Sequence, residues 1–142
     1  MSEVIQNVED HSSSKIGALR CAVWQPRQKQ VLIAIIDRGD GIFSTLRRKF
    51  PGIPDTATAL GHVIAGKFSA KSRPGNQGLG ISNVWNHATL QLGGQVLILS
   101  EDCIAASDMH GHPKMVNLTS RFPGTGVFLI VPLADKSESE HD

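Results

Sequence analysis

Three short apolar runs constrain the fold of this chain more than any other feature. They are QVLIAIID (30–37), QVLILS (95–100) and GVFLIVPL (126–133). Runs of this length that are rich in Val and Ile and bounded by turn-forming residues are typical of strands rather than helices. The sequence therefore predicts a sheet built from these runs, with the other segments packed around it.

The segments between the runs complete the predicted order of elements. They indicate a first helix at 2–11, a strand that pairs with 30–37 as a hairpin, further helices, and one more strand joined to the last run at RFPGT. The stretch 51–77 is rich in Pro, Gly and Ser around a helical core, TATALGHVIAG, and is typical of a long, mobile loop. This order predicts an α+β fold: a two-layer α/β sandwich whose mixed, mostly antiparallel sheet carries helices on one face. The remaining predicted segments are GALRCAVW (17–24), FSTLRRKF (43–50), GLGISNVWNHATLQLG (78–93) and PKMVNLTS (113–120).

Length and composition bound the class of protein. The chain has 142 residues, of which 40% are hydrophobic and 19% are charged, so we expect one globular domain at 1–133 and a disordered tail at 134–142. The net charge of +1 gives no attraction toward nucleic acid, and no apolar run approaches the ~20 residues of a membrane span. The acidic start is not a secretory signal, and the isolated Cys21 and Cys103 are typical of incidental thiols in a reducing compartment. We therefore expect a cytoplasmic protein with no membrane segment and no nucleic-acid partner.

The first predicted helix gathers its polar side chains on one side. At ~100° per residue, four polar or charged side chains share one arc and three aliphatic side chains share the adjoining arc. A chemically active face held against the sheet and an ordinary amphipathic helix with a wet face both fit this pattern. The polar arc consists of Glu3, Asn7, Asp10 and His11.

The turn DRGDG (37–41) follows a strand that is predicted to be buried, and it has three interpretations. The first is an ordinary surface turn, in which Asp and Gly are common. The second is a dinucleotide fingerprint, which fails because Ser44 stands where the third glycine is needed. The third is a ligand turn, in which an ionised Asp37 accepts hydrogen bonds at a buried strand end. The exocyclic amino group of a purine is a suitable donor, and Gly39 and Gly41 would let the backbone approach a flat ring.

Two further glycine turns border other predicted elements. RPGNQGLGIS (73–82) leads into a helix, whose unpaired N–H groups and dipole favour an anion, although glycine-rich helix starts are also common without a ligand. No Walker lysine motif is present, so this turn is not a P-loop. PGTG (123–126) opens the last run and by itself indicates only a turn.

Together and in this order, these elements resemble the GHKL superfamily, the Bergerat-fold ATP-binding domains of gyrase-type ATPases, heat-shock chaperones, sensor histidine kinases and anti-sigma-factor serine kinases. EVIQNVEDHS resembles the N box of the family, DRGDGI the first glycine box, NQGLGIS the second, and PGTGVFLIVPL the closing Gly-Thr strand. The resemblance covers residues 2–133 and implies a Bergerat fold. Family members carry a helix and an edge strand before the N box, and we expect this chain to lack them.

The resemblance implies an adenine site at the first glycine box. Asp37 would accept a hydrogen bond from the adenine amino group. Gly39, Gly41 and Ile42 belong to the same box, with Gly41 lying along the purine, and Thr125 would lie close to the ring.

The resemblance also implies a magnesium ion and a phosphate site. Asn7 would bind the Mg²⁺ that bridges the phosphates, and Gly78, Leu79 and Gly80 would form the ATP-binding start of a helix, with the two glycines donating backbone N–H groups to the phosphates. Residues from about 50 to 77 would form a lid over ATP. Two cations of this lid could reach a phosphate, namely Lys71 and Arg73.

Glu3 indicates the branch of the family, because it stands four residues before Asn7. Gyrase-type ATPases and anti-sigma serine kinases have a glutamate there as general base, and His11 matches a histidine often found in the serine kinases. The resemblance therefore implies an ATP-dependent protein kinase or ATPase of signal transduction, which transfers the γ-phosphoryl group to a protein side chain or to water. The phosphoacceptor or partner protein would lie outside this chain. The alternative is a nucleotide-gated regulatory interaction module with negligible catalysis.

A few other residue pairs have simpler interpretations. His110 and His112 flank Gly111 and could bind a metal, but no third ligand is indicated, so a surface loop is preferred. Trp24 and Trp85 are interpreted as core or edge packing rather than as platforms for stacking.

Overall fold

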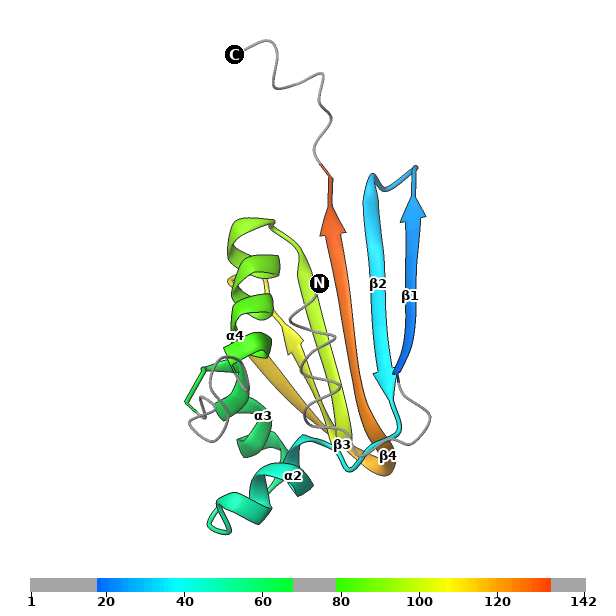
Figure 1. Cartoon of the computed structure of the whole chain (residues 1–142). Coiled ribbons are helices and arrows are strands. Elements are labelled where there is room, and N and C mark those ends of the chain that lie inside the picture. The colour runs from blue at the N-terminus through cyan, green and yellow to red at the C-terminus, as the bar shows by residue number, and fades with distance from the viewer. Residues whose placement is uncertain (1–17, 68–78, 134–142) are drawn as a thin grey trace.

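The structure, a computed structural model, describes residues 18–67 and 79–133. Its sheet has four strands: β1 (Ala18–Gln25), β2 (Gln30–Asp37), β3 (Gln95–Ser107) and β4 (Pro113–Pro132). Its helices are α2 (Ile42–Lys49), α3 (Thr56–Ile64) and α4 (Leu79–Asn86), and α4 continues into a π-helical turn, η1 (His87–Gln91). Figure 1 shows these helices together on one side of the sheet. The predicted α+β class, with a mostly antiparallel sheet, is confirmed.

The strands lie in the order β1-β2-β4-β3, and every neighbouring pair is antiparallel. β1 and β2 form the predicted hairpin, with residues 26–29 in the turn between them. β4 is central and pairs with both β2 and β3. The expectation of a mixed sheet is therefore wrong for the described strands.

The two strands predicted at 113–120 and 126–133 are one strand of 20 residues, β4. RFPGT, predicted as the turn between them, is instead part of an irregular stretch, where the register of β3 against β4 shifts between Ser100 and Glu101 and again between Glu101 and Cys103. Extra residues on one strand bulge and bend it without ending the pairing. Pro and Gly are tolerated at bulges as they are at turns, so the residue types could not distinguish a bulge within one strand from a turn between two strands.

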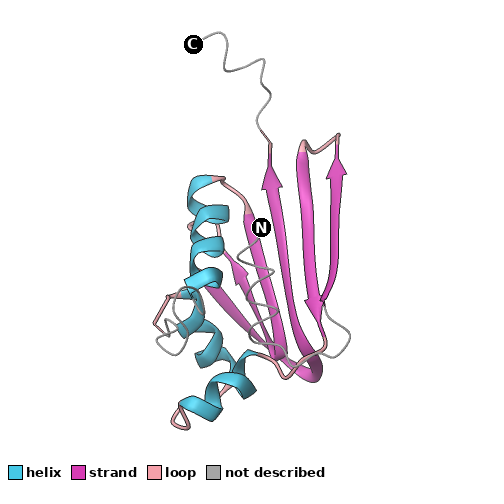
Figure 2. Ribbon diagram, in the orientation of Figure 1, coloured by secondary structure: helices cyan, strands magenta, loops and turns pink. Residues whose placement is uncertain are grey.

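The core lies between the helices and one face of the sheet, as the layers in Figure 2 show. Successive side chains of a strand point to opposite faces, so Ile35 of β2 and Val127 and Leu129 of β4 are buried on the helix side. The helices contribute buried aliphatic side chains to the same cluster, among them Leu46 of α2 and Leu60 of α3. The helix layer and the sheet therefore share one core.

α3 forms part of this core, although its sequence was predicted to belong to a long, mobile loop. Asp55 caps its N-terminus, because the Asp55 Oδ1 accepts a hydrogen bond from the Thr58 N–H at 2.8 Å and satisfies one of the unpaired donors there. Ala59 and Leu60 are fully buried. The predicted helical core TATALGHVIAG is thus confirmed by α3, and its placement in a mobile loop is wrong. Residues 68–77, with Lys71 and Arg73, lie outside the described residues, and the lid over ATP stays a prediction.

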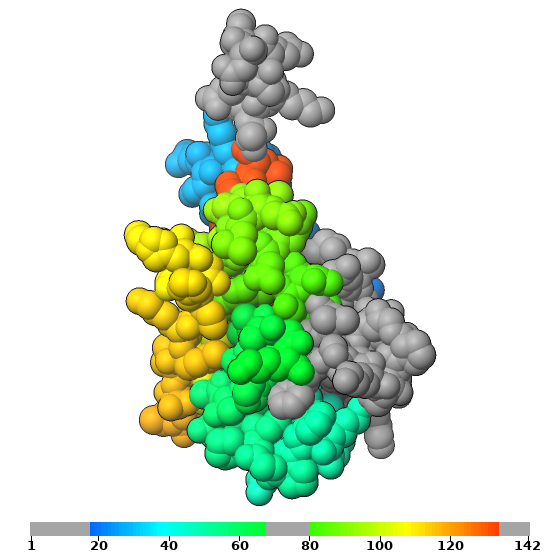
Figure 3. All heavy atoms as spheres, turned by 90° about the vertical axis from the view of Figure 1, so that its left-hand side faces the viewer, coloured from blue at the N-terminus to red at the C-terminus, as the bar shows by residue number. Residues whose placement is uncertain are grey.

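Trp85 joins α4 to the distant end of the β3–β4 hairpin. Its side chain is 1% exposed, and its Nε1–H donates a hydrogen bond to the Gly111 carbonyl at 2.8 Å. Figure 3 shows α4 and α3 forming one continuous surface beside this hairpin. Trp24 on β1 is 51% exposed, so one tryptophan is in the core and the other at the edge of the sheet.

The predicted first helix at 2–11 and the predicted tail at 134–142 lie outside the described residues. Among the residues that are described, no helix combines the length and the apolar character needed to cross a membrane.

Replacing Trp85 by Phe should destabilise the protein. The change removes the indole N–H from a buried carbonyl and leaves a void, so the free energy of unfolding should fall by about 1–3 kcal/mol. Trp24→Phe is the matched control at an exposed position and should change it by less than about 0.5 kcal/mol. Urea unfolding followed by circular dichroism measures both values, and equal effects would contradict the placement of Trp85.

Candidate functional site

Asp37 and Thr125 lie directly opposite each other on β2 and β4. The Asp37 side chain is only 3% exposed. Its carboxylate accepts a hydrogen bond from the Gly39 N–H at 2.7 Å and another from the Thr125 backbone N–H. The first and third glycine turns, which come from distant parts of the chain, thus meet at one buried carboxylate.

Gly124 explains how β4 approaches the end of β2 so closely. Its φ is 133°, and a Cβ at this position would overlap the Asp37 carbonyl oxygen and lie 2.8 Å from the Arg38 Cα. Backbone atoms cannot move aside as a flexible side chain can. A side chain at this position would therefore push the two turns apart.

Gly41 is a second point of close approach. Its φ is 87°, in the region that favours glycine, and a Cβ here would overlap the carboxyl group of Glu101. The turn after β2 therefore packs directly on a side chain of β3. Any other residue at Gly41 would have to displace that side chain.

Ser100 and Glu101 cap the start of α2, which Gly41 cannot do because it has no side chain. The Ser100 Oγ accepts a hydrogen bond from the Ile42 N–H at 2.9 Å. The Glu101 Oε1 accepts one from the Ser44 N–H at 2.8 Å. The first N–H groups of a helix need such acceptors and favour negative charge. The end of the DRGDG turn is thus held by β3.

Glu101 is unusual in both its burial and its backbone. It is 2% exposed and has a φ of 54°, which is uncommon for a residue other than glycine. Its Oε2 forms an ion pair with Arg121 at 3.0 Å, and Arg121 also donates to the Ser44 Oγ at 3.2 Å. A buried carboxylate requires such partners. Glu101 therefore lies in the register irregularity with its carboxylate aimed at the start of α2.

Sequence reasoning missed Ser100, Glu101 and Arg121. The Ser100 hydroxyl also lies 3.3 Å from the Thr125 Oγ1, so it connects the cap of α2 to the Asp37–Thr125 pair. The signal for these residues was present, because QVLILS runs directly into Glu101 as IAII runs into Asp37. A carboxylate directly after an apolar run is the same sequence signal at Glu101 and at Asp37.

The structure brings together part of the predicted site. Asp37, Gly39, Gly41, Ile42 and Thr125 form one cluster through the contacts described above. Of the second glycine box, Leu79 and Gly80 begin α4, and none of the hydrogen bonds described above joins them to this cluster. The other predicted site residues, Glu3, Asn7 and Gly78, lie outside the described residues, as does His11.

The electrostatics of the cluster centre on Asp37. Burial raises the pKa of Asp37 above its usual value, and the hydrogen bonds from the Gly39 and Thr125 N–H groups partly oppose this shift. Asp55, at the start of α3, shows the opposite behaviour: the hydrogen bonds from Thr58 lower its pKa. The two aspartates differ because the first is desolvated and the second is an exposed helix cap.

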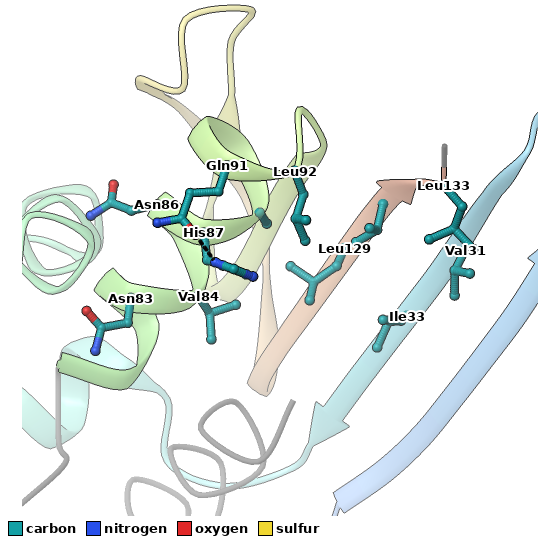
Figure 4. A pocket seen from close by; sticks show the side chains of 12 residues that line it. Val31, Ile33, Asn83, Val84, Asn86, His87, Gln91, Leu92, Leu129 and Leu133 are labelled. Atoms are coloured by element: carbon teal, nitrogen blue, oxygen red, sulfur yellow. Dashed lines mark hydrogen bonds between the residues drawn. The ribbon is translucent and has the colours of Figure 1, made fainter. Parts of the chain in front are cut away.

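A large cavity lies at another place on the helix side of the sheet. It has a volume of about 720 Å³ and is lined by residues of α4, η1, β2 and β4. Figure 4 shows Val84 and His87 on the helical side and Val31, Ile33 and Leu129 on the strands. Its walls are mainly aliphatic, with amide groups and His87 at the rim. The cavity and the carboxylate cluster are therefore separate features, and Asp37 does not line this cavity.

His110 and His112 form a turn rather than a metal centre. Both backbone N–H groups donate to the Asp108 Oδ1, at 2.8 and 2.9 Å, and both residues are exposed. Within residues 18–67 and 79–133, no group of three or more His, Cys, Asp or Glu side chains could hold a metal ion. This supports the surface-loop interpretation of the two histidines.

Asp37 and Asp55 should give opposite pH dependences of stability. The folded pKa of Asp37 is raised, so its stabilising contribution is present below the unfolded value of 3.8 and is lost as the pH rises through the folded pKa. Asp37→Asn should therefore gain stability relative to wild type as the pH rises above 3.8. The folded pKa of Asp55 is lowered, so its contribution is present above 3.8 and is lost as the pH falls through the folded pKa. The stability of Asp55→Asn should therefore approach that of wild type as the pH falls below 3.8.

Urea unfolding of the three proteins from about pH 2 to pH 7 covers both titrations and measures the two differences. The sign of each slope is the test, since both variants replace one carboxylate by an amide of the same shape. Slopes of the same sign would contradict the contrast between a desolvated aspartate and an exposed cap.

Comparison with known proteins adds no assignment to this geometry. The sequence matches no protein-family model and no curated protein. The function of the cluster around Asp37 has therefore to be inferred from its own residues and from the motifs in the sequence.

Proposed function

We propose that the chain is an ATP-binding domain of the GHKL type with a Bergerat fold, which binds Mg-ATP with its adenine at the turn 37–41. The observation that carries this proposal is the buried pair Asp37 and Thr125. The sequence motifs assign these two residues to the same adenine ring, and they are neighbours across β2 and β4. An ordinary surface turn would not require its Asp to be buried.

The hydrogen-bonding capacity of Asp37 supports a ligand donor. An ionised carboxylate offers about four acceptor positions, and two are used by the Gly39 and Thr125 N–H groups. The remaining capacity suits an exocyclic amino group. A site built to accept a hydrogen bond discriminates strongly against a ligand without the donor, so we expect the turn to prefer adenine over hypoxanthine.

The glycines of the same cluster fit a flat ligand. Gly41 approaches the Glu101 side chain and Gly124 approaches the β2 backbone without an intervening Cβ, so the end of β2 is a compact platform. Ser100 and Glu101 hold α2 on its far side. A platform whose backbone is fixed before binding loses less entropy when the ligand arrives.

Apart from Gly80, the phosphoryl-transfer part of the proposal depends on residues outside the described ones. In it, Glu3 is the general base, Asn7 is the Mg²⁺ ligand, and Gly78 and Gly80 donate N–H groups to the phosphates. Bound Mg²⁺ would neutralise phosphate charge, and Glu3 would orient or deprotonate a side-chain hydroxyl or water. These roles rest on the motif resemblance.

Asp37→Asn should abolish most of the adenine recognition. Calorimetric titration of wild type with a non-hydrolysable Mg-ATP analogue should show binding, and the same analogue carrying inosine should bind more weakly. The variant should lose about 10- to 100-fold in affinity for the adenine analogue, because a buried charged acceptor contributes roughly 1.5–3 kcal/mol. It should also lose the preference between the two bases.

Asp40→Asn is the matched control in the same turn. Asp40 forms a partly exposed ion pair with Arg48 at 2.5 Å, and such pairs contribute little, so affinity should stay within about threefold of wild type. A folded wild type that binds neither analogue would refute the proposal. Equal affinity of wild type and Asp37→Asn would remove the adenine assignment.

Glu3→Ala separates catalysis from nucleotide-gated regulation. If Glu3 is the general base, ATP turnover should fall by about 100-fold or more, while the affinity for the Mg-ATP analogue stays within a few-fold. Asp10→Ala removes another acid of the same predicted arc and should leave turnover nearly unchanged. Binding without measurable turnover in wild type would favour the regulatory module instead.

A further inference from the structure

The two edge strands of the described sheet differ in how their outer edges are protected. The pairing of β3 with β4 is interrupted by two register shifts, with Glu101 and Asp102 at the irregularity. Bulges and charges of this kind hinder the addition of another strand. β1 instead pairs with β2 over eight consecutive positions without a shift, and it contains no proline and a single charge, Arg20. Among the described strands, β1 pairs with β2 alone, so β1 is the edge suited to accept a further strand.

β1 is also apolar for a strand so exposed. Leu19 and Val23 are 68% and 46% exposed, and alternation places both on the face of the sheet opposite the helices. Cys21 lies between them on that face and is an exposed free thiol. Leu19 and Val23 continue the row of Ile36 and Leu32, their partners on β2. An apolar row that reaches an edge suited to pairing indicates an interaction surface.

We propose that a second copy of this chain pairs with β1, strand against antiparallel strand, with the two-fold axis midway between the Cys21 residues of the two copies. Leu19 of each copy then lies opposite the partner's Val23, so that the two exposed aliphatic side chains of the strand cover each other. Cys21 lies opposite the partner's Cys21. The two four-stranded sheets become one continuous sheet of eight strands.

The sequence of β1 selects this register over its neighbours. Directly opposite residues of an antiparallel pair share a face, so a two-fold axis perpendicular to the sheet must place one residue opposite the same residue of the partner. If Arg20 lay opposite the partner's Arg20, two guanidinium groups would face each other, which is destabilising. If Ala22 lay opposite the partner's Ala22, Leu19 would lie opposite the partner's Gln25 and the apolar row would be broken. Only the register with Cys21 opposite the partner's Cys21 pairs Leu19 with Val23.

The arrangement of the helices leaves room for this pairing. α2 and α3 contact β3, and α3 also contacts β4, so the described helices lie over the half of the sheet that is distant from β1. Figure 1 shows β1 as the outermost strand on the other side. A partner approaching along β1 therefore meets no described helix. This inference does not depend on the proposed nucleotide site.

Sedimentation equilibrium of the full chain over a range of concentrations tests the pairing. Wild type should show a reversible monomer–dimer equilibrium. Val23→Asp should raise the dissociation constant by at least about tenfold, because a carboxylate would be buried against the partner's Leu19 without a partner of its own.

Val116→Asp is the matched control for that variant. Val116 is 52% exposed on β4, so this variant also places an Asp at an exposed strand position but away from β1. It should change the dissociation constant by less than about threefold. Circular dichroism checks that both variants are folded. A wild type that stays monomeric, or equal weakening by both variants, would overturn the proposal.

Cross-linking through Cys21 tests the register. A short bismaleimide should link two wild-type chains efficiently, and Cys21→Ser should abolish the product because Cys103 is buried. Val23→Asp should reduce the yield in parallel with its weaker association. A dimer that Cys21 fails to cross-link would overturn the two-fold axis between the two Cys21 residues.

Discussion

The shape of the candidate site depends on the contacts that the buried Glu101 carboxylate makes with the start of α2 and with Arg121. The left-handed backbone of Glu101 costs roughly 1–3 kcal/mol. This cost is offset because the carboxylate accepts a hydrogen bond from the Ser44 N–H and forms an ion pair with Arg121. If the start of α2 moved away, a buried charge would lose a partner. The turn that carries Asp37 is therefore held between the end of β2 and a helix that β3 caps.

Close packing around the site requires glycine at two positions. Gly41 has to leave space for the Glu101 side chain, and Gly124 has to leave space for the backbone at the end of β2. Neighbouring atoms fill the space beside both glycines, so the Asp37 carboxylate is buried. It still has acceptor positions beyond those used by the Gly39 and Thr125 N–H groups. This combination suits the recognition of a neutral donor such as an amino group, since a desolvated acceptor strongly penalises any ligand that leaves it unpaired.

Much of the local structure could be predicted because it depends on local residue patterns. The hairpin of β1 and β2, the helix at 42–49 and the end of the last helical segment near Gly93 follow from apolar periodicity and turn residues. The predicted break in β4 failed, since Pro123 and Gly124 form part of an irregular stretch within a continuous strand. α3 was predicted as a helix, but its Pro- and Gly-rich surroundings led to its placement in a mobile loop rather than in the packed core. In both cases long-range packing decided between two conformations that the residues allow.

By itself, the sequence determined the strands and helices that depend on periodicity, and it indicated Asp37, Gly39 and Gly41 as a candidate ligand turn. Local chemistry sufficed for this, because an acid at the end of an apolar run and glycines in turns are visible in a linear pattern. The tertiary structure decided that Thr125 faces Asp37 across two strands, that Glu101 caps α2, and that β1 is an edge. Each of these facts depends on the order of the strands in the sheet, and that order depends on contacts between residues far apart in the chain.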